Sequence, residues 1–446
     1  MELLQQLSIL IHVLIILISI LVEIYRYKTQ KRIFDILFLI NALFGMYLGL
    51  IPILYQLVFP YFTISLYYLP THIQITDFSK DGPFLTSLII LFSYISFLCF
   101  YFIFNKKHVK NISVEFNIDK QMKLLTWGIG TLSLVALFIY VNSFGGIVEA
   151  IVSANLIRRH DGATSSYTFL RYIYPLIQPA AILSWAIWFK FRRKFDFLVF
   201  IIFFAASVLF LLINAGRANI VVFFGVFFLT FLSIKNKFSV ITLSPFILLG
   251  LALALFGNEI FTVLSGGEGS FTDSNSRIGL KLVMELSHIY VNLLKVNEFV
   301  FEGGGVYIFK DILISFVELL PGGIEKDIWN NSINTTKLHT AYFSPPAGTG
   351  IIVDIISYGY YQLGLPGSLF VSALFGVVCS KTDNFFRTRA CIYYLCILTW
   401  TAFFYMGLLS SFELKSIILG RIAYWLPLLF IMYLSFKNYK GFSKNA

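Results

Sequence analysis

Charged residues are scarce in this chain of 446 residues. Asp, Glu, Lys and Arg make up only 13% of it, whereas a soluble globular protein contains about 25% charged residues. Hydrophobic residues account for 58%, and the mean hydropathy is +0.80. This balance excludes a soluble globular protein. It predicts a protein that crosses a lipid bilayer several times.

Cysteine is also rare, and several motifs that support catalysis are missing. The four cysteines lie in or beside apolar stretches and lack the paired spacing of a metal site: Cys99, Cys379, Cys391 and Cys396. The chain has no P-loop, no zinc-ligand spacing and no G-x-S-x-G motif. The segments expected outside the membrane contain no D-x-D pair. We therefore expect no metal and no cofactor, and we expect arginine to neutralise any anionic substrate.

Apolar stretches recur along the whole chain. A helix needs about 20 apolar residues to cross the hydrocarbon core. On this criterion we predict eleven spans, at about 8–25, 34–58, 85–104, 124–145, 169–189, 197–214, 218–234, 239–257, 352–379, 390–408 and 416–436. Gly364, Pro366 and Gly367 interrupt the ninth span, which is compatible with a short interfacial helix before a crossing one.

The first span lacks the basic flank and the cleavage site of a signal peptide. The expected fold is an all-α polytopic membrane protein with one transmembrane domain over residues 1–446.

Basic residues cluster in alternate loops between these spans. Most of the 34 Lys and Arg residues lie around 26–32, 106–123, 190–194, 235–237, 381–389 and 437–444. Loops rich in Lys and Arg remain in the cytoplasm, so the N-terminus is expected in the periplasm and the C-terminus in the cytoplasm. The same pattern argues that the net charge of +11 serves membrane topology and not nucleic-acid binding.

The longest polar insertion covers residues 258–350, between the eighth and ninth spans, and is expected in the periplasm. Within it, residues 278–300 are amphipathic at helical spacing, and 306–320 are apolar enough to lie on a membrane. The insertion carries more acidic than basic residues. We therefore expect it to be partly helical and a poor binder of polyanions by itself.

Three arginines stand where the positive-inside rule disfavours them. Arg171, Arg217 and Arg421 lie near the external N-terminal ends of the fifth, seventh and eleventh spans. Helix N-termini favour phosphate, and the guanidinium group binds phosphate oxygens through paired donors. This placement predicts a phosphate-binding role, which Arg277 would assist. The alternative is that each arginine reaches lipid headgroups or pairs with a carboxylate such as Glu413.

One histidine stands out among six. His339 begins the segment HTAYFSPPAGTG, in which prolines and glycines impose an irregular backbone just before a span. Such backbone is tolerated at membrane depth only inside protein or beside a water-filled cavity. His339 is therefore a candidate catalytic residue, although a single histidine is more often structural. The others offer no partner pattern: His12, His72, His108, His160 and His288.

These residues lie in a set of motifs that resembles the bacterial O-antigen polymerase (Wzy) family, which is related to the O-antigen ligases. The resemblance covers most of the chain from about residue 120 onward. It is carried by LRYIYPLIQPAA around Arg171, NAGRANIVVFF around Arg217, LPGG at 320–323, H-x10-G from His339, Y-x-x-G-L-P-G-S-L at 361–369 and ELKSIILGR from Glu413 to Arg421. The H-x10-G element occurs in the ligases as well, so it supports the superfamily more than the polymerases.

The resemblance implies a metal-independent glycosyltransferase at the periplasmic face of the bacterial inner membrane. It would move a growing glycan from undecaprenyl pyrophosphate onto a new lipid-linked repeat unit, with membrane lipids and a chain-length-determining co-polymerase as partners. Arg171, Arg217, Arg421 and Arg277 would bind pyrophosphate. His339 would orient or deprotonate the acceptor hydroxyl, and Glu413 would position Arg421 or the histidine. An O-antigen ligase and a flippase or other secondary transporter remain the alternatives.

Overall fold

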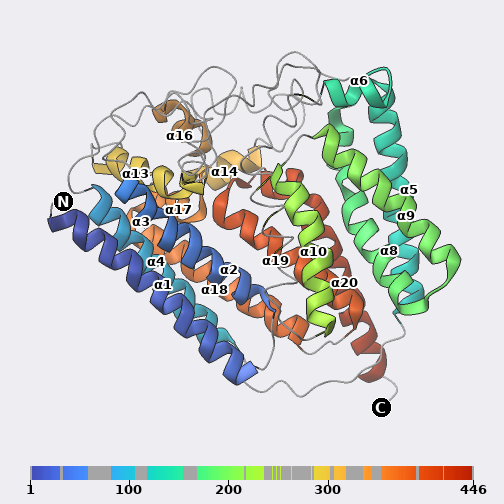
Figure 1. Ribbon diagram of the computed structural model, residues 1–446, viewed down its shortest axis with the longest axis horizontal. Coiled ribbons are helices and arrows are strands. Elements are labelled where there is room, and N and C mark those ends of the chain that lie inside the picture. The colour runs from blue at the N-terminus through green and yellow to red at the C-terminus, as the bar shows by residue number, and fades with distance from the viewer. Residues whose placement is uncertain are drawn as a thin grey trace. The chain divides into compact units, whose positions relative to one another are not determined.

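The fold is described from a computed structural model of the chain. Its described residues are 3–30, 34–58, 82–105, 118–153, 168–214, 217–235, 286–301, 306–317, 335–343, 353–387, 391–414 and 416–443, with the isolated positions 244, 248, 252, 263 and 283. Over these ranges every regular element is a helix (Figure 1). Arg277 and the predicted span at 239–257 lie outside the described ranges, apart from the isolated positions 244, 248 and 252.

Eight of the described helices are long and apolar enough to cross a membrane. They are Leu3–Thr29, Ile36–Leu57, Gly82–Phe104, Asp119–Asn142, Phe169–Phe191, Lys194–Ile213, Leu365–Arg387 and Ile392–Ser410. Each corresponds to a span expected from the sequence. Two further apolar helices, Asn219–Ile234 and Ile422–Ser435, match the seventh and eleventh predicted spans. The protein is therefore an all-α multi-pass membrane protein, while the total of eleven crossings stays a prediction.

The ninth predicted span is divided at Gly364. Helix α17 (Ile355–Leu363) ends there, and α18 (Leu365–Arg387) begins at the next residue. Gly364 has a φ of 65°, a left-handed conformation that glycine adopts at no steric cost. Pro366 follows at the start of α18, where its missing N–H has no helical partner to lose. Only α18 is long enough to cross a bilayer.

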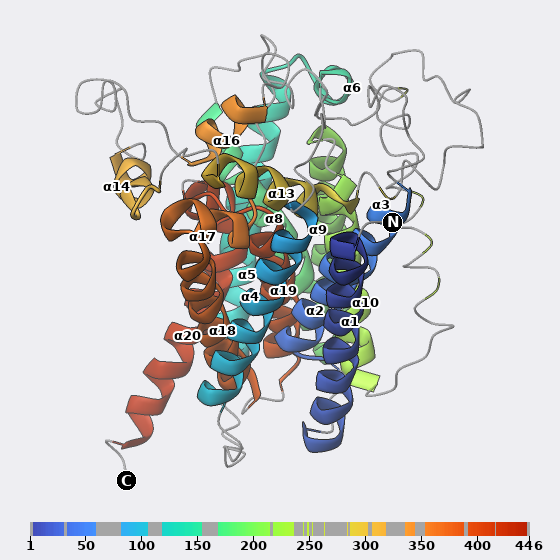
Figure 2. The ribbon, with the colours of Figure 1, turned by 90° about the vertical axis from the view of Figure 1, so that its left-hand side faces the viewer.

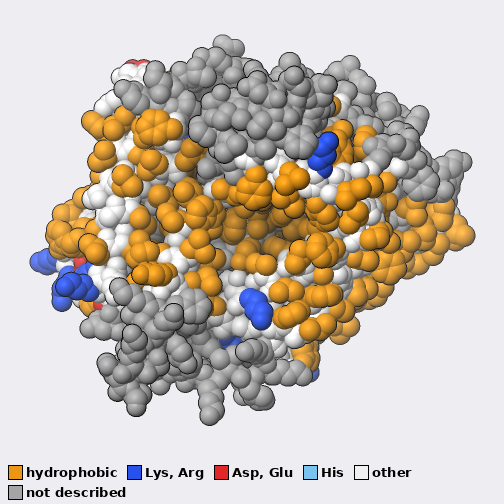
Figure 3. Space-filling view, turned by 180° about the vertical axis from the view of Figure 1, so that it is seen from behind, with side chains coloured by type: hydrophobic (Ala, Val, Ile, Leu, Met, Phe, Trp, Pro, Cys, Tyr) orange, Lys and Arg blue, Asp and Glu red, His pale blue; other side chains and the backbone are white. Residues whose placement is uncertain are grey.

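Contacts divide the chain into two compact units. Unit 1 comprises Met1–His108, Ser274–Asn384 and Tyr405–Ile418, and unit 2 comprises Val109–Asp273, Phe385–Phe404 and Leu419–Ala446. The helices are numbered in chain order in Figures 1 and 2. Hydrophobic side chains cover most of the described surface visible in Figure 3, as expected for helices that face lipid.

Unit 1 is built from long apolar helices and from short helices of the long insertion. Its elements are α1 (Leu3–Gln30), α2 (Ile36–Leu43), the π-helix η1 (Phe44–Leu50), α3 (Ile51–Val58), α4 (Gly82–Phe104), α13 (His288–Phe301), α14 (Lys310–Val317), α16 (Thr335–Phe343), α17 and most of α18. Helix α1 packs on α4 and η1. Gly376 of α18 lies so close to α4 that a Cβ would stand 2.4 Å from the carbonyl oxygen of Phe97. Small residues allow this approach between membrane helices.

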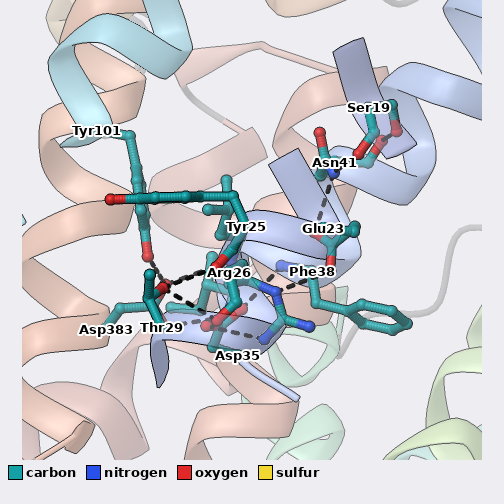
Figure 4. Close-up of polar contacts among 12 residues, drawn as sticks. Ser19, Glu23, Tyr25, Arg26, Thr29, Asp35, Phe38, Asn41, Tyr101 and Asp383 are labelled. Atoms are coloured by element: carbon teal, nitrogen blue, oxygen red, sulfur yellow. Dashed lines mark hydrogen bonds and ion pairs between the residues drawn. The ribbon is translucent and has the colours of Figure 1, made fainter. Parts of the chain in front are cut away.

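A buried ion pair joins the end of α1 to the start of α2 (Figure 4). The Nε of Arg26 donates to Glu23 at 2.7 Å, and an Nη donates to Asp35 at 3.3 Å. Asp35 also caps α2 by accepting the N–H of Phe38 at 2.8 Å. Sequence reasoning placed Arg26 in a cytoplasmic loop. The structure shows it buried on α1, because two neighbouring carboxylates compensate its charge.

Asp383 of α18 connects this helix to the start of α2 and to α4, near the Arg26 ion pair. Its carboxylate accepts the backbone N–H of Ile36 at 2.9 Å and of Leu37 at 3.3 Å, and the hydroxyl of Tyr101 at 2.6 Å. Three separate elements, α2, α4 and α18, therefore meet at one buried side chain.

At the opposite end of α1, a second buried network holds α13. The amide of Gln56 donates to Tyr290 at 2.8 Å and to Ser8 at 2.9 Å. Ser8 lies 2.6 Å from Ser87, which is 2.9 Å from Nε2 of His12. Tyr290 belongs to the long insertion, so these bonds anchor a segment of that insertion among α1, α3 and α4.

Unit 2 contains two sets of packed helices. The first set is α5 (Asp119–Asn142), the short α6 (Ile147–Val152), the 3-10 turns η3 (Thr168–Tyr172) and η4 (Tyr174–Leu176), α8 (Ile177–Phe191) and α9 (Lys194–Ile213). The second is α10 (Arg217–Lys235), α19 (Ile392–Ser410, mostly in this unit) and α20 (Ile422–Ser443), which the π-helix η7 (Ser416–Gly420) precedes. Trp400 of α19 donates its Nε1–H to the carbonyl of Ala423 at 2.9 Å.

We expect Asp383→Ala to lower the free energy of unfolding by about 3 kcal/mol, because the substitution leaves buried donors without an acceptor. Thermal denaturation of the detergent-purified protein would measure the change. Val378→Ala, on the exposed side of the same helix, is the matched control and should have a small effect. Equal midpoints for Asp383→Ala and wild type would show that Asp383 does not join these helices.

Candidate functional site

His339 lies in α16, a short helix of the long insertion. The helix starts at Thr335, whose backbone N–H donates to Oδ1 of Asp311 in α14 at 2.6 Å. A carboxylate at this position satisfies one of the amide groups that a helix N-terminus leaves unpaired, and it favours the helix dipole. Residues four apart share one helix face, so Thr335 and His339 are buried together.

The imidazole of His339 pairs with Tyr361 of α17. Its Nδ1 lies 2.8 Å from the Tyr361 hydroxyl, and the two rings meet edge to face with centroids 5.7 Å apart. Burial lowers the pKa of His339 to about 3, because a buried imidazolium loses its hydration. The imidazole is therefore neutral at pH 7. A base with this pKa captures a proton poorly at neutral pH.

Gln362 connects the segments around His339. Its Oε1 accepts the N–H of Phe309 at 2.7 Å, and its Nε2 donates to Thr335 Oγ1 at 3.1 Å. The backbone carbonyls of Tyr361 and Gln362 accept the N–H groups of Tyr307 and Ile308, both at 3.0 Å. Residues 306–317 and α16, which are separate in sequence, are thus both bound to α17.

The backbone that enters α14 is strained. Ile308 and Phe309 have φ values of 48° and 56°, a left-handed region that costs about 1–2 kcal/mol for a side chain with a Cβ. Three of the hydrogen bonds to α17 come from this strained segment and its neighbour Tyr307. The interactions of α17 therefore hold a conformation that the local sequence disfavours.

Asp354 caps the start of α17. Its Oδ1 accepts the N–H groups of Ile356 at 3.0 Å and Ser357 at 2.9 Å, and its Oδ2 accepts the Ser357 hydroxyl. The carboxyl is completely buried, and this burial raises its pKa to about 6. Asp354 thus has its acceptor oxygens occupied by α17 itself, which indicates that it positions this helix and does not meet a substrate.

Glu413 lies beside α17 within the same unit. The preceding residue, Phe412, donates its N–H to the carbonyl of Val353 at 2.6 Å and packs on Tyr358 with ring centroids 4.7 Å apart. Tyr358 in turn interacts with Asp311, and burial is the main cause of its raised pKa. The structure therefore brings Glu413 and His339 to the same group of short helices.

Three of the four predicted cations, Arg171, Arg217 and Arg421, belong to unit 2. Arg171 lies in η3, half-buried, and interacts with the hydroxyl of Tyr174 in η4. Tyr174 packs on Tyr140 near the end of α5, and its hydroxyl lies 3.4 Å from Asn214 at the end of α9. The start of α8 is therefore next to the end of α9 and the end of α5.

The other two arginines begin helices at this end of unit 2. Arg217 is the first residue of α10, three positions after Asn214, but its side chain lies outside the described atoms. Arg421 directly precedes α20 and is half-buried, and α20 packs against η4. The joint role of these arginines in phosphate binding therefore stays a prediction. Whether they share a cavity with His339 of unit 1 stays a prediction.

Sequence reasoning missed three polar residues of this site: Asp311, Asp354 and Tyr361. An aspartate directly before a helix is a recognisable N-cap signal, so Asp354 could have been found. Tyr361 begins the Y-x-x-G-L-P-G-S-L motif, but the motif does not indicate its contact with His339. Asp311 caps a helix 24 residues away, and no local pattern identifies such a partner.

Among the described residues, no three His, Cys, Asp or Glu side chains are arranged to hold a metal ion. No protein-family model, curated protein or solved structure matches the chain. The likeness to the O-antigen polymerases therefore rests on the sequence motifs.

The buried Asp354 predicts a pH dependence of stability. Its pKa is about 6 in the folded protein and about 3.9 in an unfolded chain, so the folded state binds more protons between these values. Stability therefore falls as pH rises from about 4 to 6. Asp354→Asn keeps a capping oxygen without titrating, and we expect its stability relative to wild type to increase by roughly 2 kcal/mol across this range.

Thermal denaturation at pH 4 to 7 would measure this difference. Glu149→Gln removes an exposed carboxyl from α6 and serves as the control with a wild-type slope. An identical pH slope for Asp354→Asn and wild type would contradict the raised pKa.

Proposed function

We propose that this protein is a polymerase of lipid-linked oligosaccharide repeat units at the periplasmic face of a bacterial inner membrane. The observation that carries the proposal is that η4, whose Tyr174 interacts with Arg171, contacts both α20 and the end of α9, three residues before α10. The first residue of α10 is Arg217, and the residue before α20 is Arg421. A membrane protein that collects cations at the N-termini of apolar helices is suited to a lipid with an anionic headgroup.

Pyrophosphate fits this arrangement for a physical reason. The first N–H groups of a helix carry a partial positive charge, and guanidinium groups donate paired hydrogen bonds to phosphate oxygens. A polyprenyl pyrophosphate would keep its lipid tail beside the apolar helices while its headgroup meets these donors. Arg277, which directly precedes the amphipathic segment 278–300, is proposed to assist.

The proposed step is a glycosyl transfer. A hydroxyl oxygen of the acceptor repeat unit forms a bond with the anomeric carbon of the growing glycan. The bond from that carbon to the pyrophosphate oxygen breaks, and its electron pair leaves with undecaprenyl pyrophosphate. The hydroxyl proton passes to a base or to the departing pyrophosphate. Arginines beside the leaving group would stabilise the charge that develops there, which is commonly the largest contribution to catalysis.

His339 and Glu413 are proposed to serve the acceptor side of the reaction. Both belong to unit 1 and to the group of short helices around α17. Glu413 precedes η7, which leads to Arg421, so it is proposed to position that arginine or the histidine. His339 has no exposed surface in this structure. Its contact with a substrate therefore requires a local movement of α16 or its surroundings.

Gene deletion in the native host tests the class of activity. The surface polysaccharide, resolved by size, should collapse to a single repeat unit. A ladder that persists would overturn the proposal. Long polymer that remains on undecaprenyl pyrophosphate would indicate a ligase, and repeat units trapped on the inner leaflet would indicate a flippase. Membrane lipids and a chain-length-determining co-polymerase are the proposed partners.

Complementation of the deletion strain tests the site. We expect Arg171→Ala and His339→Ala to reduce polymerisation about 100-fold, since loss of one donor to a developing anion has effects of this size. Arg193→Ala is the matched control, because it removes a cation from the opposite end of α8. Normal ladders from both site variants, at equal levels of membrane protein, would exclude these residues from the reaction.

A further inference from the structure

The contact between His339 and Tyr361 carries information about where the imidazole proton resides. The hydroxyl lies 2.8 Å from Nδ1, so one group donates and the other accepts. A phenol loses its proton with a pKa near 10, and a neutral imidazole N–H is a far weaker acid. The nitrogen lone pair is also the better acceptor. The stronger hydrogen bond is therefore O–H to Nδ1, which leaves the ring proton on Nε2.

We propose that Tyr361 holds His339 as the Nε2–H tautomer, so that His339 donates a hydrogen bond to an anionic oxygen of the lipid-linked substrate and does not act as a general base. This inference rests on the proposed function for its substrate, a phosphate or pyrophosphate oxygen. It departs from both acceptor-hydroxyl roles predicted from the sequence and moves the contact of His339 to the phosphate side of the lipid-linked substrate. Tyr361 is a positioning residue in this scheme.

The surrounding contacts keep this pair in place. Asp311 caps α16 at Thr335, and Thr335 accepts the amide of Gln362, the neighbour of Tyr361. The ring of Phe299 packs edge to face on Tyr361 with centroids 5.5 Å apart. Two helices are therefore tied together one turn away from the His339–Tyr361 contact. These contacts fix the imidazole relative to Tyr361, and the tautomer depends on that arrangement.

The environment also suits a neutral donor. Both rings are completely buried, and a cation at this position would lose its hydration. The Asp311 carboxylate lies at the start of α16, Lys337 of the same helix is exposed, and Asp354 caps the end of α17 away from Tyr361. The low pKa of His339 agrees with this geometry. A neutral imidazole that acts through its N–H is an established way to polarise an oxygen atom.

Substitutions of His339 distinguish hydrogen-bond donation by its Nε2–H from removal of a proton by the imidazole acting as a base. Glutamine places an amide N–H near the position of Nε2 but takes up no proton at pH 7, whereas asparagine places its amide near Nδ1. We expect His339→Gln to keep polymerisation within about ten-fold of wild type, and His339→Asn and His339→Ala to lose about 100-fold. Equal loss in all three variants, at equal membrane levels and with monodisperse protein, would overturn the proposal.

Nitrogen-15 NMR of protein labelled at histidine reads the tautomer without any activity. The signal that disappears in His339→Ala identifies this residue, and we expect it to show protonated Nε2 and unprotonated Nδ1. In Tyr361→Phe the hydrogen bond to Nδ1 is lost, so the signal should move toward a mixture of tautomers. A protonated Nδ1 in wild type would overturn the inference.

The two experiments also distinguish this inference from the proposed function. If the NMR spectrum shows the Nε2–H form while gene deletion leaves the polysaccharide ladder intact, the polymerase proposal fails and the tautomer stands. If deletion abolishes the ladder but Nδ1 is protonated, the polymerase proposal stands and the donor role fails.

Discussion

Polar groups inside the membrane have to be satisfied by other parts of the protein, because the hydrocarbon core offers no water. The structure of unit 1 depends on this constraint at both ends of α1. At one end, Arg26 and Asp383 join α1, α2, α4 and α18 through ion pairs and backbone hydrogen bonds. At the other, Gln56 donates directly to Tyr290 of the long insertion, and His12 is linked to Gln56 through Ser87 and Ser8. Because apolar contacts between lipid-facing helices are weakly directional, these few polar contacts specify which helices are neighbours.

The same constraint explains how a long polar insertion becomes part of the site. Once α13 is anchored by Tyr290, the segments that follow it in the chain have a fixed surface to pack on. Helix α17 is the common partner: Tyr361 contacts His339, and Gln362 binds both the start of α14 and Thr335.

Individual residues show where sequence reasoning succeeds and where it stops. Arg171, Arg217 and Arg421 became candidates because each violates the expected distribution of charge at the end of an apolar span, and their function stays a prediction. The break at Gly364 was identifiable because glycine and proline act through local backbone geometry. Arg26 was misassigned to a loop, because one of its two stabilising carboxylates, Asp35, lies beyond the end of α1, at the start of α2. Tyr361 and Asp311 escaped notice, since their importance comes from contacts with residues more than twenty positions away.

The sequence by itself determined that this is an all-α multi-pass membrane protein, because apolar length and the spacing of charged residues are local properties. It also determined which cations and which histidine were worth considering. Only the tertiary structure decided that His339 is buried against Tyr361, that Asp311 starts its helix, and that Arg171 lies beside the ends of α5 and α9. The physical reason is that hydrogen bonds and desolvation depend on distances between segments, and these distances are set by the packing of helices that are remote in sequence.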